Sequence, residues 1–287
     1  MREVGEVRVF GLIPAAGMSR RMGRAKQILR FHGRTFVDRA ASTLLESGVE
    51  SVVVVTRSEL IGQLDLPGDR RAFVVVNDDA GSEMIDSIRM GLAGLAGEFP
   101  TIGWPAPPVS CLDGCGVEKN PRARQPNGLR PLRRPTIPRP SDGVMVLPCD
   151  LPGLPVSACR VCLQTYRRDP QGIVVGGYHG QRGHPIVFPF GLRGEIDKLR
   201  GGLDELLRWH EENPRSGVSC ASVSPVGTPQ SPRSVVTWSL VETGDARVLR
   251  DVDTPHDLAQ AEYLDCSAEV EPGGMSVSQP ETRPGSP

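Results

Sequence analysis

The sequence predicts an α/β domain in which helices cover both faces of a mostly parallel sheet. Three apolar runs carry the prediction, at Val7–Ile13, Ser51–Thr56 and Arg71–Val76. The second and third do not alternate apolar with polar residues, which is typical of parallel strands buried on both faces. A helical pattern over Thr35–Ser47, ended by Gly48, separates the first two runs. Strand–helix–strand alternation favours a parallel sheet, in which ligands bind beyond the carboxyl ends of the strands.

Composition agrees with a soluble enzyme. The chain has 287 residues and a formal net charge of −1, so bulk attraction to nucleic acid or to a membrane surface is not expected. No apolar stretch approaches the roughly 20 residues that a membrane span needs, and the first residues lack a signal-peptide pattern. Seven cysteines without regular spacing favour reduced thiols over a disulfide framework. We expect a cytoplasmic protein.

The stretch Leu12–Lys26 is the main candidate for chemistry. It follows the first apolar run, and its small residues Ala15, Ala16 and Gly17 leave the backbone N–H groups accessible to a polyanion. Four cations come next, at positions 20, 21, 24 and 26. A strand end, a bare turn and fixed positive charge predict a triphosphate site, although a surface loop with solvated arginines is the simpler alternative.

The residue pattern of this stretch narrows the type of phosphate loop. It matches neither G-x-x-x-x-G-K-[ST] nor G-x-G-x-x-G. It resembles the A-A-G-x-S-x-R-M-G-x-x-K signature of nucleotidyltransferases with the molybdenum-cofactor guanylyl- and cytidylyltransferase fold, which implies a Rossmann-like domain of the nucleotide-diphospho-sugar transferase type. The resemblance implies catalytic roles for Arg21 and Lys26. It also implies nucleotide contacts from the residues Pro14, Ala15, Ala16, Gly17 and Ser19.

A second segment of the same resemblance follows the third apolar run. Gly81–Leu92 predicts a helix with Ser82 as its N-cap, and its S-I-R-x-G-L portion resembles the family segment near the base and ribose. An ordinary capped helix is the alternative. The resemblance implies nucleotide contacts from Asn77, Gly81, Ser82, Ser87 and Arg89.

Prolines interrupt the pattern between Gly97 and Ser141. At this density proline cannot support a helix or a central strand, so 97–141 is interpreted as an insertion that is removable without loss of the fold. Cys111 and Cys115 lie inside it. Two thiols without a second pair fall short of a structural zinc site.

An acid ends the next strand. The run from Asp142 to Pro152 places Asp150 at the carboxyl end of an apolar strand and resembles the family's D-x-P motif. Nucleotidyl transfer needs a carboxylate at such a position, because Mg²⁺ takes oxygen ligands and neutralises charge on the departing pyrophosphate. A carboxylate that merely opens a turn is the alternative.

A helix is expected over 155–168, followed by the apolar run Gly172–Tyr178, which leads into Gln181–Phe188. Within this second segment, R-G-H-P stands before a short strand and resembles the acceptor-side segment of the molybdopterin cytidylyltransferase branch. This implies acceptor contacts from Arg182, Gly183 and His184. A single histidine is more often structural, and that alternative remains open.

The last part of the chain supplies a second acid. We expect two short helices over 195–199 and 203–210, a loop over 213–234, and strands at Val235–Leu240 and Arg247–Arg250. Thr254, Pro255 and Asp257 form a strong helix start. The residue before them, Asp253, resembles the second acid of the family's D-x-D-T-P element and is expected to share Mg²⁺ with Asp150. The domain is predicted to span 1–265, with a disordered tail over 266–287.

These observations predict a Mg²⁺-dependent nucleotidyltransferase. It joins an NTP, with CTP favoured and GTP as the alternative, to a phosphorylated acceptor such as molybdopterin and releases pyrophosphate. Pro14 and the Lys26-Gln27 pair resemble isoprenoid-precursor and sugar-phosphate relatives, which keeps those cytidylyltransferases open. A non-catalytic nucleotide-binding maturation chaperone is the hypothesis from another class.

Overall fold

One sheet runs through the whole domain. The computed structural model describes residues 6–17, 22–64, 71–103, 136–212 and 237–268. The eight strands of the sheet lie in the order β10-β8-β9-β7-β1-β4-β5-β6. Their bounds are β1 Val9–Ala15, β4 Val52–Thr56, β5 Ala72–Val76, β6 Ile102–Gly103, β7 Gly143–Val146, β8 Ile173–Tyr178, β9 Gln181–Pro189 and β10 Trp238–Glu242. Strands β9 and β6 are antiparallel to their neighbours, and the other pairs are parallel.

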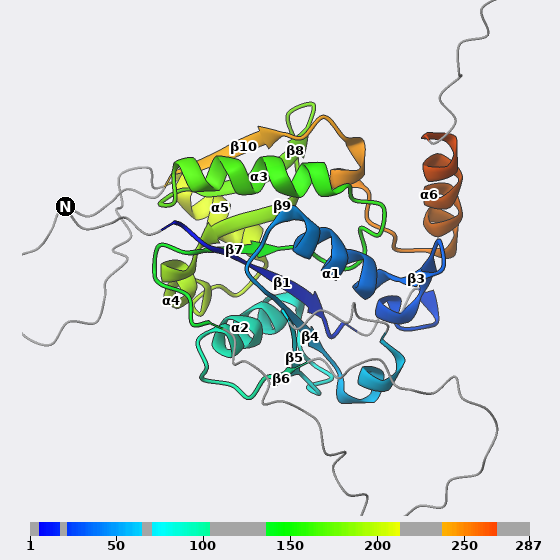
Figure 1. The fold of residues 1–287 in the computed structure, drawn as a ribbon, viewed down its shortest axis with the longest axis horizontal. Helices are drawn as coiled ribbons and strands as arrows, with labels where there is room; N and C mark the ends of the chain where they lie inside the picture. Colours follow the sequence, from blue (N-terminus) through cyan, green and yellow to red (C-terminus); the bar gives the residue numbers. More distant parts are fainter. Residues whose placement is uncertain (1–5, 18–21, 65–70, 104–135, 213–236, 269–287) are drawn as a thin grey trace, which may run out of the picture.

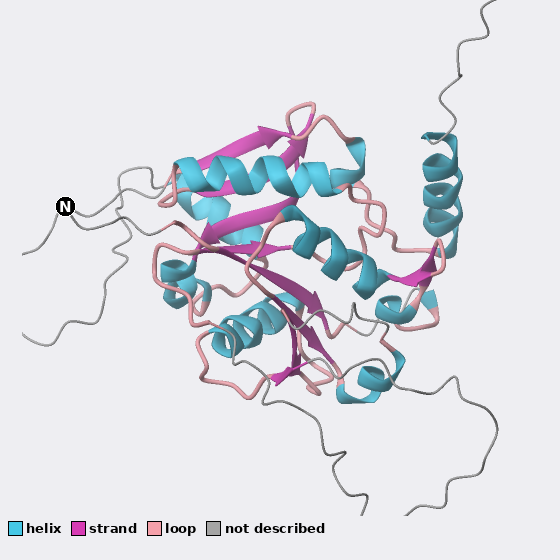
Figure 2. Ribbon diagram, viewed as in Figure 1, coloured by secondary structure: helices cyan, strands magenta, loops and turns pink. Residues whose placement is uncertain are grey.

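Helices cover both faces of the sheet, as the sequence predicts (Figures 1 and 2). The α-helices are α1 Phe36–Ser47, α2 Met84–Leu95, α3 Val156–Arg168, α4 Arg193–Ile196, α5 Leu203–Glu212 and α6 Pro255–Ala268. The shorter elements are the 3₁₀ turns η2 Lys26–Ile28, η3 Ser58–Gln63, η4 Phe190–Leu192 and η5 Ala246–Leu249, and a hairpin of β2 Arg30–Phe31 with β3 Arg34–Thr35. None of the helices in the described ranges is long and apolar enough to span a membrane.

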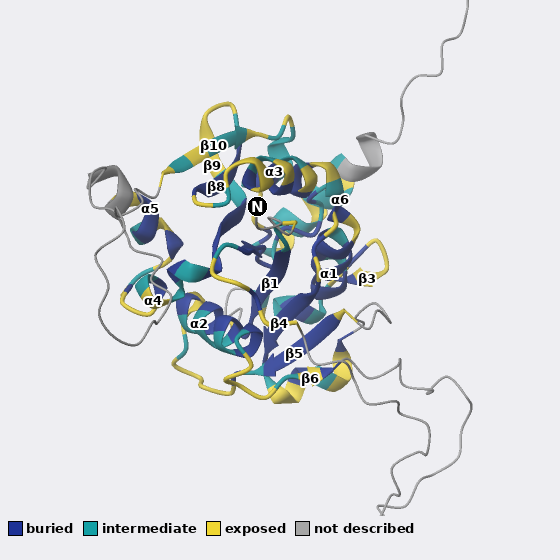
Figure 3. Ribbon diagram, turned by 60° about the vertical axis from the view of Figure 1, so that its left-hand side comes forward, coloured by how far each residue is buried: buried dark blue, intermediate teal, exposed yellow. Residues whose placement is uncertain are grey.

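Alternate side chains of β1 pack into two separate hydrophobic cores. Val9 and Ile13 belong to a buried cluster with α1 and α3, whereas Phe10 and Leu12 belong to a cluster with α2, α4 and α5. Figure 3 shows the central strands buried between these layers. Helix α2 approaches β1 closely because Gly91 has no side chain: a Cβ there would lie 2.6 Å from Leu12 Cδ1. The predicted three-layer, mostly parallel architecture is therefore confirmed.

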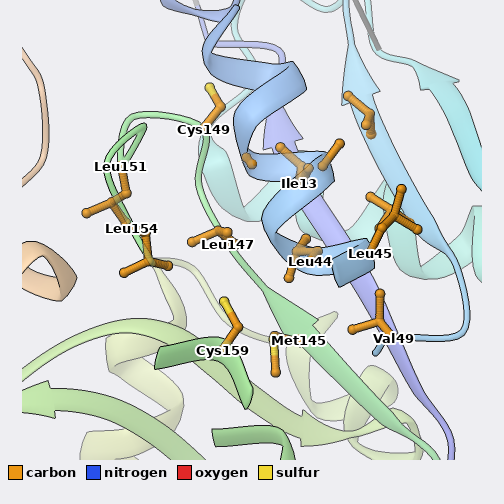
Figure 4. Close-up of a cluster of buried hydrophobic side chains, with 14 of the residues drawn as sticks. Ile13, Leu44, Leu45, Val49, Met145, Leu147, Cys149, Leu151, Leu154 and Cys159 are labelled. Atoms are coloured by element: carbon orange, nitrogen blue, oxygen red, sulfur yellow. The ribbon is translucent and has the colours of Figure 1, made fainter. Parts of the chain in front are cut away.

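The first core also holds the loop that follows β7. Figure 4 shows Leu147, Leu151 and Leu154 beside Ile13 and Leu44 in one cluster. These leucines are at most 4% exposed. Burial of the residues on either side of Asp150 fixes the position of its backbone, so the acid is presented by a rigid loop.

Helix ends follow their sequence signals, with one correction. Thr35 Oγ1 accepts a hydrogen bond from Asp38 N at the start of α1, and Gly48 ends this helix with φ of 102°. At α2, however, the N-cap is Glu83 and not Ser82, because Glu83 and Asp86 form a reciprocal capping box. Ser82 Oγ instead accepts a hydrogen bond from Asn77 Nδ2 at 2.7 Å. Several polar residues in a row make the cap position ambiguous in the sequence.

Two predicted strand positions are also corrected. Residues Arg247–Arg250 do not form a strand: the turn η5 covers Ala246–Leu249, and Asp245 accepts a hydrogen bond from Arg247 N to begin it. The R-G-H-P residues do not precede a short strand but lie within the nine-residue strand β9. The apolar spacing of residues 247–250 fits a strand and a turn equally well. The packing of this segment against β8 and β9 makes it a turn.

The ends of the predicted insertion 97–141 belong to the fold. Ile102–Gly103 pairs with β5 as an edge strand, and Gly191 N donates a hydrogen bond to Pro140 O. Asp142, whose side chain is fully buried, accepts hydrogen bonds from Arg8 and Arg139 and ties the start of β7 to the start of β1. The segment that we predict to be removable is therefore shorter than 97–141. Cys111 and Cys115, the 213–234 loop and residues 269–287 lie outside the described residues, whereas 266–268 continue α6.

Candidate active site

A pocket of about 200 Å³ opens at the carboxyl ends of β1 and β7. It is lined by Pro14, Ala16, Gly17, Lys26, Gln27, Met84, Ser87, Pro148, Cys149 and Asp150. Six of these residues are among the predicted site residues, and they come from four separate parts of the chain. The carboxyl ends of adjacent parallel strands meet at one edge of the sheet, and this geometry brings the parts together.

A lysine between two acids forms the charged centre of the site. Lys26 Nζ lies 3.4 Å from Asp150 Oδ2 and donates a shorter hydrogen bond to Asp253 Oδ1. The Lys26 side chain is 13% exposed, that of Asp150 20% and that of Asp253 43%. Burial by itself would lower the pKa of Lys26, but the hydrogen bond to Asp253 and the charge of Asp150 outweigh it and raise the pKa. Lys26 is therefore a fixed cation at neutral pH.

Backbone contacts position Asp253 beside Asp150. Val252 N donates a hydrogen bond to Asp150 O at 2.8 Å, which fastens the two segments together. The helix start of α6 then holds the turn, because Asp257 Oδ2 accepts from the backbone N–H groups of both Asp253 and Thr254. The capping residues predicted from the sequence thus fix the backbone at the second acid.

A third carboxylate, Asp251, joins this cluster and was not predicted. Its side chain reaches solvent, yet partial desolvation and the negative charges of Asp150 and Asp253 raise its pKa to about 6. The signal was present in the sequence: residues two apart on an extended segment face the same side. No group of three potential metal-binding side chains is found within the described ranges.

Gln27 shapes the bare turn and was also not predicted. Its side chain is 2% exposed, and Nε2 donates to Ala15 O at 2.6 Å and to Gly17 O at 2.8 Å. Both carbonyl oxygens are thereby occupied by hydrogen bonds. An anion is repelled by carbonyl oxygens and attracted by N–H groups, so this arrangement favours phosphate binding on the open side of the turn. The sequence shows only a polar residue after Lys26, and its burial is visible only in the folded chain.

The second predicted nucleotide segment is a hydrogen-bonded scaffold beside the pocket. Asn77, which is 2% exposed, donates to Ser82 Oγ at 2.7 Å and to Ser87 Oγ at 3.4 Å. Of this set only Ser87 lines the pocket. Arg89 is directed elsewhere: it pairs with Asp86 at 2.7 Å and donates to the backbone carbonyls of Ile196 and Leu199. Gly81 N donates to Asp79 Oδ1 at 2.8 Å, within the same turn.

The predicted acceptor residues lie at the start of β9, two strands away from β1 and at the same edge of the sheet as the signature turn. His184 is within the electrostatic reach of Asp150, and burial lowers its pKa, so its imidazole is neutral at pH 7. Its Nδ1 atom has no hydrogen-bond partner among the described residues. The Arg182 guanidinium lies 5.7 Å from the centre of the Trp238 ring. Ser19 and Arg21 fall outside the described residues.

Gly183 is needed for packing, which yields the first testable expectation. A Cβ at this position would lie 2.2 Å from Val248 O. Gly183→Ala therefore forces η5 away from β9 and is expected to destabilise the domain by about 1–3 kcal/mol, the usual cost of overpacking. Urea unfolding measures this. Gly194→Ala is the matched control, because no atom lies within 4 Å of its added Cβ. A fully stable Gly183→Ala variant contradicts the packing role.

Comparison with known proteins places these features in a family. Residues 11–214 match the model of the MobA-like NTP transferase domain. A 2-C-methyl-D-erythritol 4-phosphate cytidylyltransferase from Rhodococcus jostii is 40% identical over 94 residues, 31% of this chain and 39% of that protein. A probable molybdenum cofactor guanylyltransferase from Opitutus terrae is 49% identical over 49 residues, 17% of this chain and 24% of that protein. The chain thus spans well under half the length of either relative.

A third relative gives a wider but weaker match. It is named nicotine blue oxidoreductase, from Paenarthrobacter nicotinovorans, and is 28% identical over 202 residues, which cover 68% of this chain and 77% of that protein. Its name assigns it to a reaction class other than nucleotidyl transfer.

Two solved structures share the fold at low identity. A nucleotidyl transferase from Methanothermobacter has a TM-score of 0.56 at 14% identity, covering 91% of this chain and 99% of that one. A Mycobacterium tuberculosis protein in complex with manganese has a TM-score of 0.52 at 18% identity, covering 89% and 98%.

Proposed function

Because the chain belongs to the family of MobA-like NTP transferase domains, we propose that it transfers a nucleotidyl group to a phosphorylated acceptor. An acceptor phosphate oxygen attacks the α-phosphorus of an NTP and forms a new P–O bond. The bond from the α-phosphorus to the bridging oxygen breaks, and its electron pair leaves with pyrophosphate. The attacking phosphate is already ionised, so positioning and charge neutralisation supply the catalysis.

The Lys26–Asp150–Asp253 cluster beside the bare turn is the observation that carries this proposal. The N–H groups of the turn at Ala15, Ala16 and Gly17 hold the triphosphate, with its carbonyls tied back by Gln27. Lys26 stabilises the charge that collects on the leaving pyrophosphate. Arg21 lies in the same signature and is proposed to have the same role as Lys26. Pro14, Ser19 and the Asn77–Ser87 scaffold are proposed to contact the nucleotide.

A divalent metal ion fits the acids of the site. Asp150 Oδ1 is buried and has no hydrogen-bond partner among the described residues, so this carboxylate has an oxygen left to bind a cation. Asp150 and Asp253 would hold Mg²⁺, which prefers carboxylate oxygens. When bound, the metal neutralises negative charge on phosphate oxygens. One neighbour of the same fold is a complex with manganese, which is also a divalent ion.

The identity of the two substrates rests on finer resemblances. The R-G-H-P residues 182–185 favour CTP and a molybdopterin-like acceptor, with contacts from Arg182, Gly183 and His184. The Rhodococcus relative is named a cytidylyltransferase and the Opitutus relative a guanylyltransferase, so GTP is the alternative nucleotide. Pro14 and Gln27 keep an isoprenoid-precursor or sugar-phosphate acceptor as the alternative acceptor. These substrates imply a cytoplasmic protein without nucleic-acid or membrane partners.

A pyrophosphate-release assay tests the proposal directly. Four NTPs are combined with molybdopterin and with 2-C-methyl-D-erythritol 4-phosphate, in the presence of Mg²⁺ or Mn²⁺. Release that requires one NTP and one acceptor supports the enzyme. A protein that binds an NTP but releases nothing in any combination is instead a nucleotide-binding chaperone. The assay must detect pyrophosphate itself, because one relative is named for a redox reaction.

Lys26→Ala separates catalysis from binding. The contact between the Lys26 ammonium and the leaving pyrophosphate strengthens as negative charge collects there, so it stabilises mainly the transition state. Its loss is expected to lower kcat by about 10²–10³, which is the usual effect of removing one preorganised hydrogen-bond donor. The affinity for NTP, measured by calorimetry, should change much less. Equal and small changes in both quantities would mean that Lys26 is only a surface charge.

A further inference from the structure

One arginine of α1 contacts both of the segments that carry the charged centre of the site. Arg39 Cζ lies 4.7 Å from the centre of the Phe31 ring, in the β2–β3 hairpin. Its Nε atom donates a hydrogen bond of 2.6 Å to Pro152 O, in the loop after β7. Phe31 follows Lys26 by five positions, and Pro152 follows Asp150 by two. Arg39 therefore links the segment of the lysine to the segment of the acid.

Carbonyl groups are the points at which the loop after β7 can be held. Three of its residues, at positions 148, 152 and 155, are prolines and have no N–H group to donate. Helix α1 supplies two donors to this loop: Arg39 Nε bonds Pro152 O at 2.6 Å, whereas Thr43 Oγ1 lies 3.5 Å from Leu154 O. The bond from Arg39 is the stronger of the two, because it is much shorter and its donor is charged.

The segment that carries Lys26 is anchored to the same helix. Phe36 N, at the start of α1, donates a hydrogen bond to Leu29 O at 2.9 Å. The Phe31 side chain is fully buried, and a Cβ at Gly153 would lie 3.8 Å from Phe31 Cζ. The hairpin therefore packs against both α1 and the loop after β7. Helix α1 is thus a common support for the lysine and for the acid.

We propose that Arg39 is a positioning residue, which sets the separation of Lys26 and Asp150 by holding the β2–β3 hairpin and the loop after β7 against α1. Arg39 is not among the residues that line the active-site pocket, so it acts through these two segments. Its effect on catalysis rests on the proposed function, whereas its effect on the position of the loop does not.

Three variants test this role. Arg39→Met keeps a long side chain beside Phe31 and removes the donor to the loop. Arg160→Met is the matched control, because Arg160 Nη2 donates to Glu46 O at 2.9 Å and joins α3 to the last turn of α1. It removes the same kind of bond at the end of α1 that lies away from the hairpin. Arg39→Lys is the conservative variant, which keeps the charge but not the planar donor group.

Amide hydrogen exchange on the full chain, without nucleotide, is the first measurement. The Val252 N–H donates to Asp150 O at 2.8 Å and reports whether the backbone of the acid stays in place. The Gly11 N–H donates to Ser51 O at 2.8 Å and reports opening of the central sheet. In Arg39→Met we expect exchange at Val252 to be faster by about tenfold or more, with an unchanged rate at Gly11. The control should match the wild type at both amides, and Arg39→Lys should lie between.

Steady-state kinetics supply the second measurement. Arg39→Met is expected to lower kcat by about tenfold or more, because small displacements of positioned groups are costly. The KM for the NTP should stay within a factor of about two, since the turn that is proposed to hold the triphosphate is not held by Arg39. Arg39→Lys should recover part of the lost kcat, and Arg160→Met should retain all of it.

Equal exchange at Val252 in Arg39→Met and Arg160→Met overturns the positioning role. Equal acceleration at Val252 and Gly11 also overturns it, since the arginine then only stabilises the fold. Faster exchange at Val252 with a wild-type kcat overturns the role in catalysis. If Arg39→Met does not fold, Arg39→Lys against Arg160→Lys decides at the same two amides. A chain inert with every NTP and acceptor defeats the proposed enzyme, and the exchange rates then still decide whether Arg39 positions the loop.

Discussion

Replacement of Asp150 by Asn is expected to lower kcat by about 10²–10³ while leaving the fold intact, because the change removes one preorganised charge and no bulk. Asp150 is the only acid at the carboxyl end of β7 within the described residues, and it lies against Lys26 at 3.4 Å. Its amide replacement keeps the shape of the loop but binds a divalent cation poorly, since hard cations prefer charged oxygen ligands. Steady-state pyrophosphate release at saturating Mg²⁺ measures the effect.

The control for this variant is Asp197→Asn, at an exposed position after α4. It removes the same charge at a residue that does not line the pocket and should keep kcat within a factor of about two. Thermal unfolding of Asp150→Asn should stay within about 2 °C of the wild type, since the flanking leucines still anchor the loop. Near-normal turnover of Asp150→Asn would remove this residue from the catalytic group.

The largest stability effect is expected at Asp142. Its side chain is fully buried and accepts hydrogen bonds from Arg8 Nε at 3.1 Å, Arg139 N at 2.8 Å and Arg139 Nη2 at 2.9 Å. Asp142→Ala leaves both guanidinium groups without this carboxylate and is expected to cost about 3 kcal/mol. That value lies at the low end for a broken buried pair, because both arginines also reach solvent. Urea unfolding at pH 7 measures it.

The contribution of Asp142 to the free energy of unfolding depends on pH, and its direction follows from the pKa. Burial would raise the pKa of Asp142, but the hydrogen bonds from Arg139 and Arg8 outweigh it and hold the pKa below its usual range. A lowered pKa in the folded state stabilises the protein above the unfolded value of about 3.9, and this contribution is lost as the pH falls through the folded pKa. The difference between wild type and Asp142→Ala should narrow below about pH 4. A difference that stays constant down to pH 2 would contradict the assignment.

Local patterns in the sequence predicted the sheet and the strand-end positions well. Strands such as Val52–Thr56 are recognisable because continuous β-branched runs have few alternatives, and Asp150 lies four residues after the end of β7. The clustering of Lys26 with Asp253, 227 positions apart, is not a local property. It depends on the backbone link between Val252 and Asp150, which only the folded chain reveals.

The residues that were missed or misplaced share one physical cause: several side chains offered the same local chemistry. Ser82 and Glu83 are both able to cap α2, and the Asn77 side chain decides between them by using Ser82. Gln27 looked like an ordinary polar residue until burial placed its amide behind the bare turn. Likewise, η5 has the composition of a strand, and its contacts with β8 and β9 make it a turn.

The positions at which the stretch 104–135 joins the domain leave the length of this stretch weakly constrained. Gly103 pairs with Phe73 near the start of β5, and Arg139 is held by Asp142 before the start of β7, so both ends lie at the amino-terminal edge of the sheet. For a flexible connection, doubling its length raises the entropy of loop closure by only about 0.6 kcal/mol. Length at this position is therefore nearly neutral for folding, and it is separated from the chemistry by the full height of the strands. A change of length at this edge is expected to leave the geometry around Lys26 unchanged.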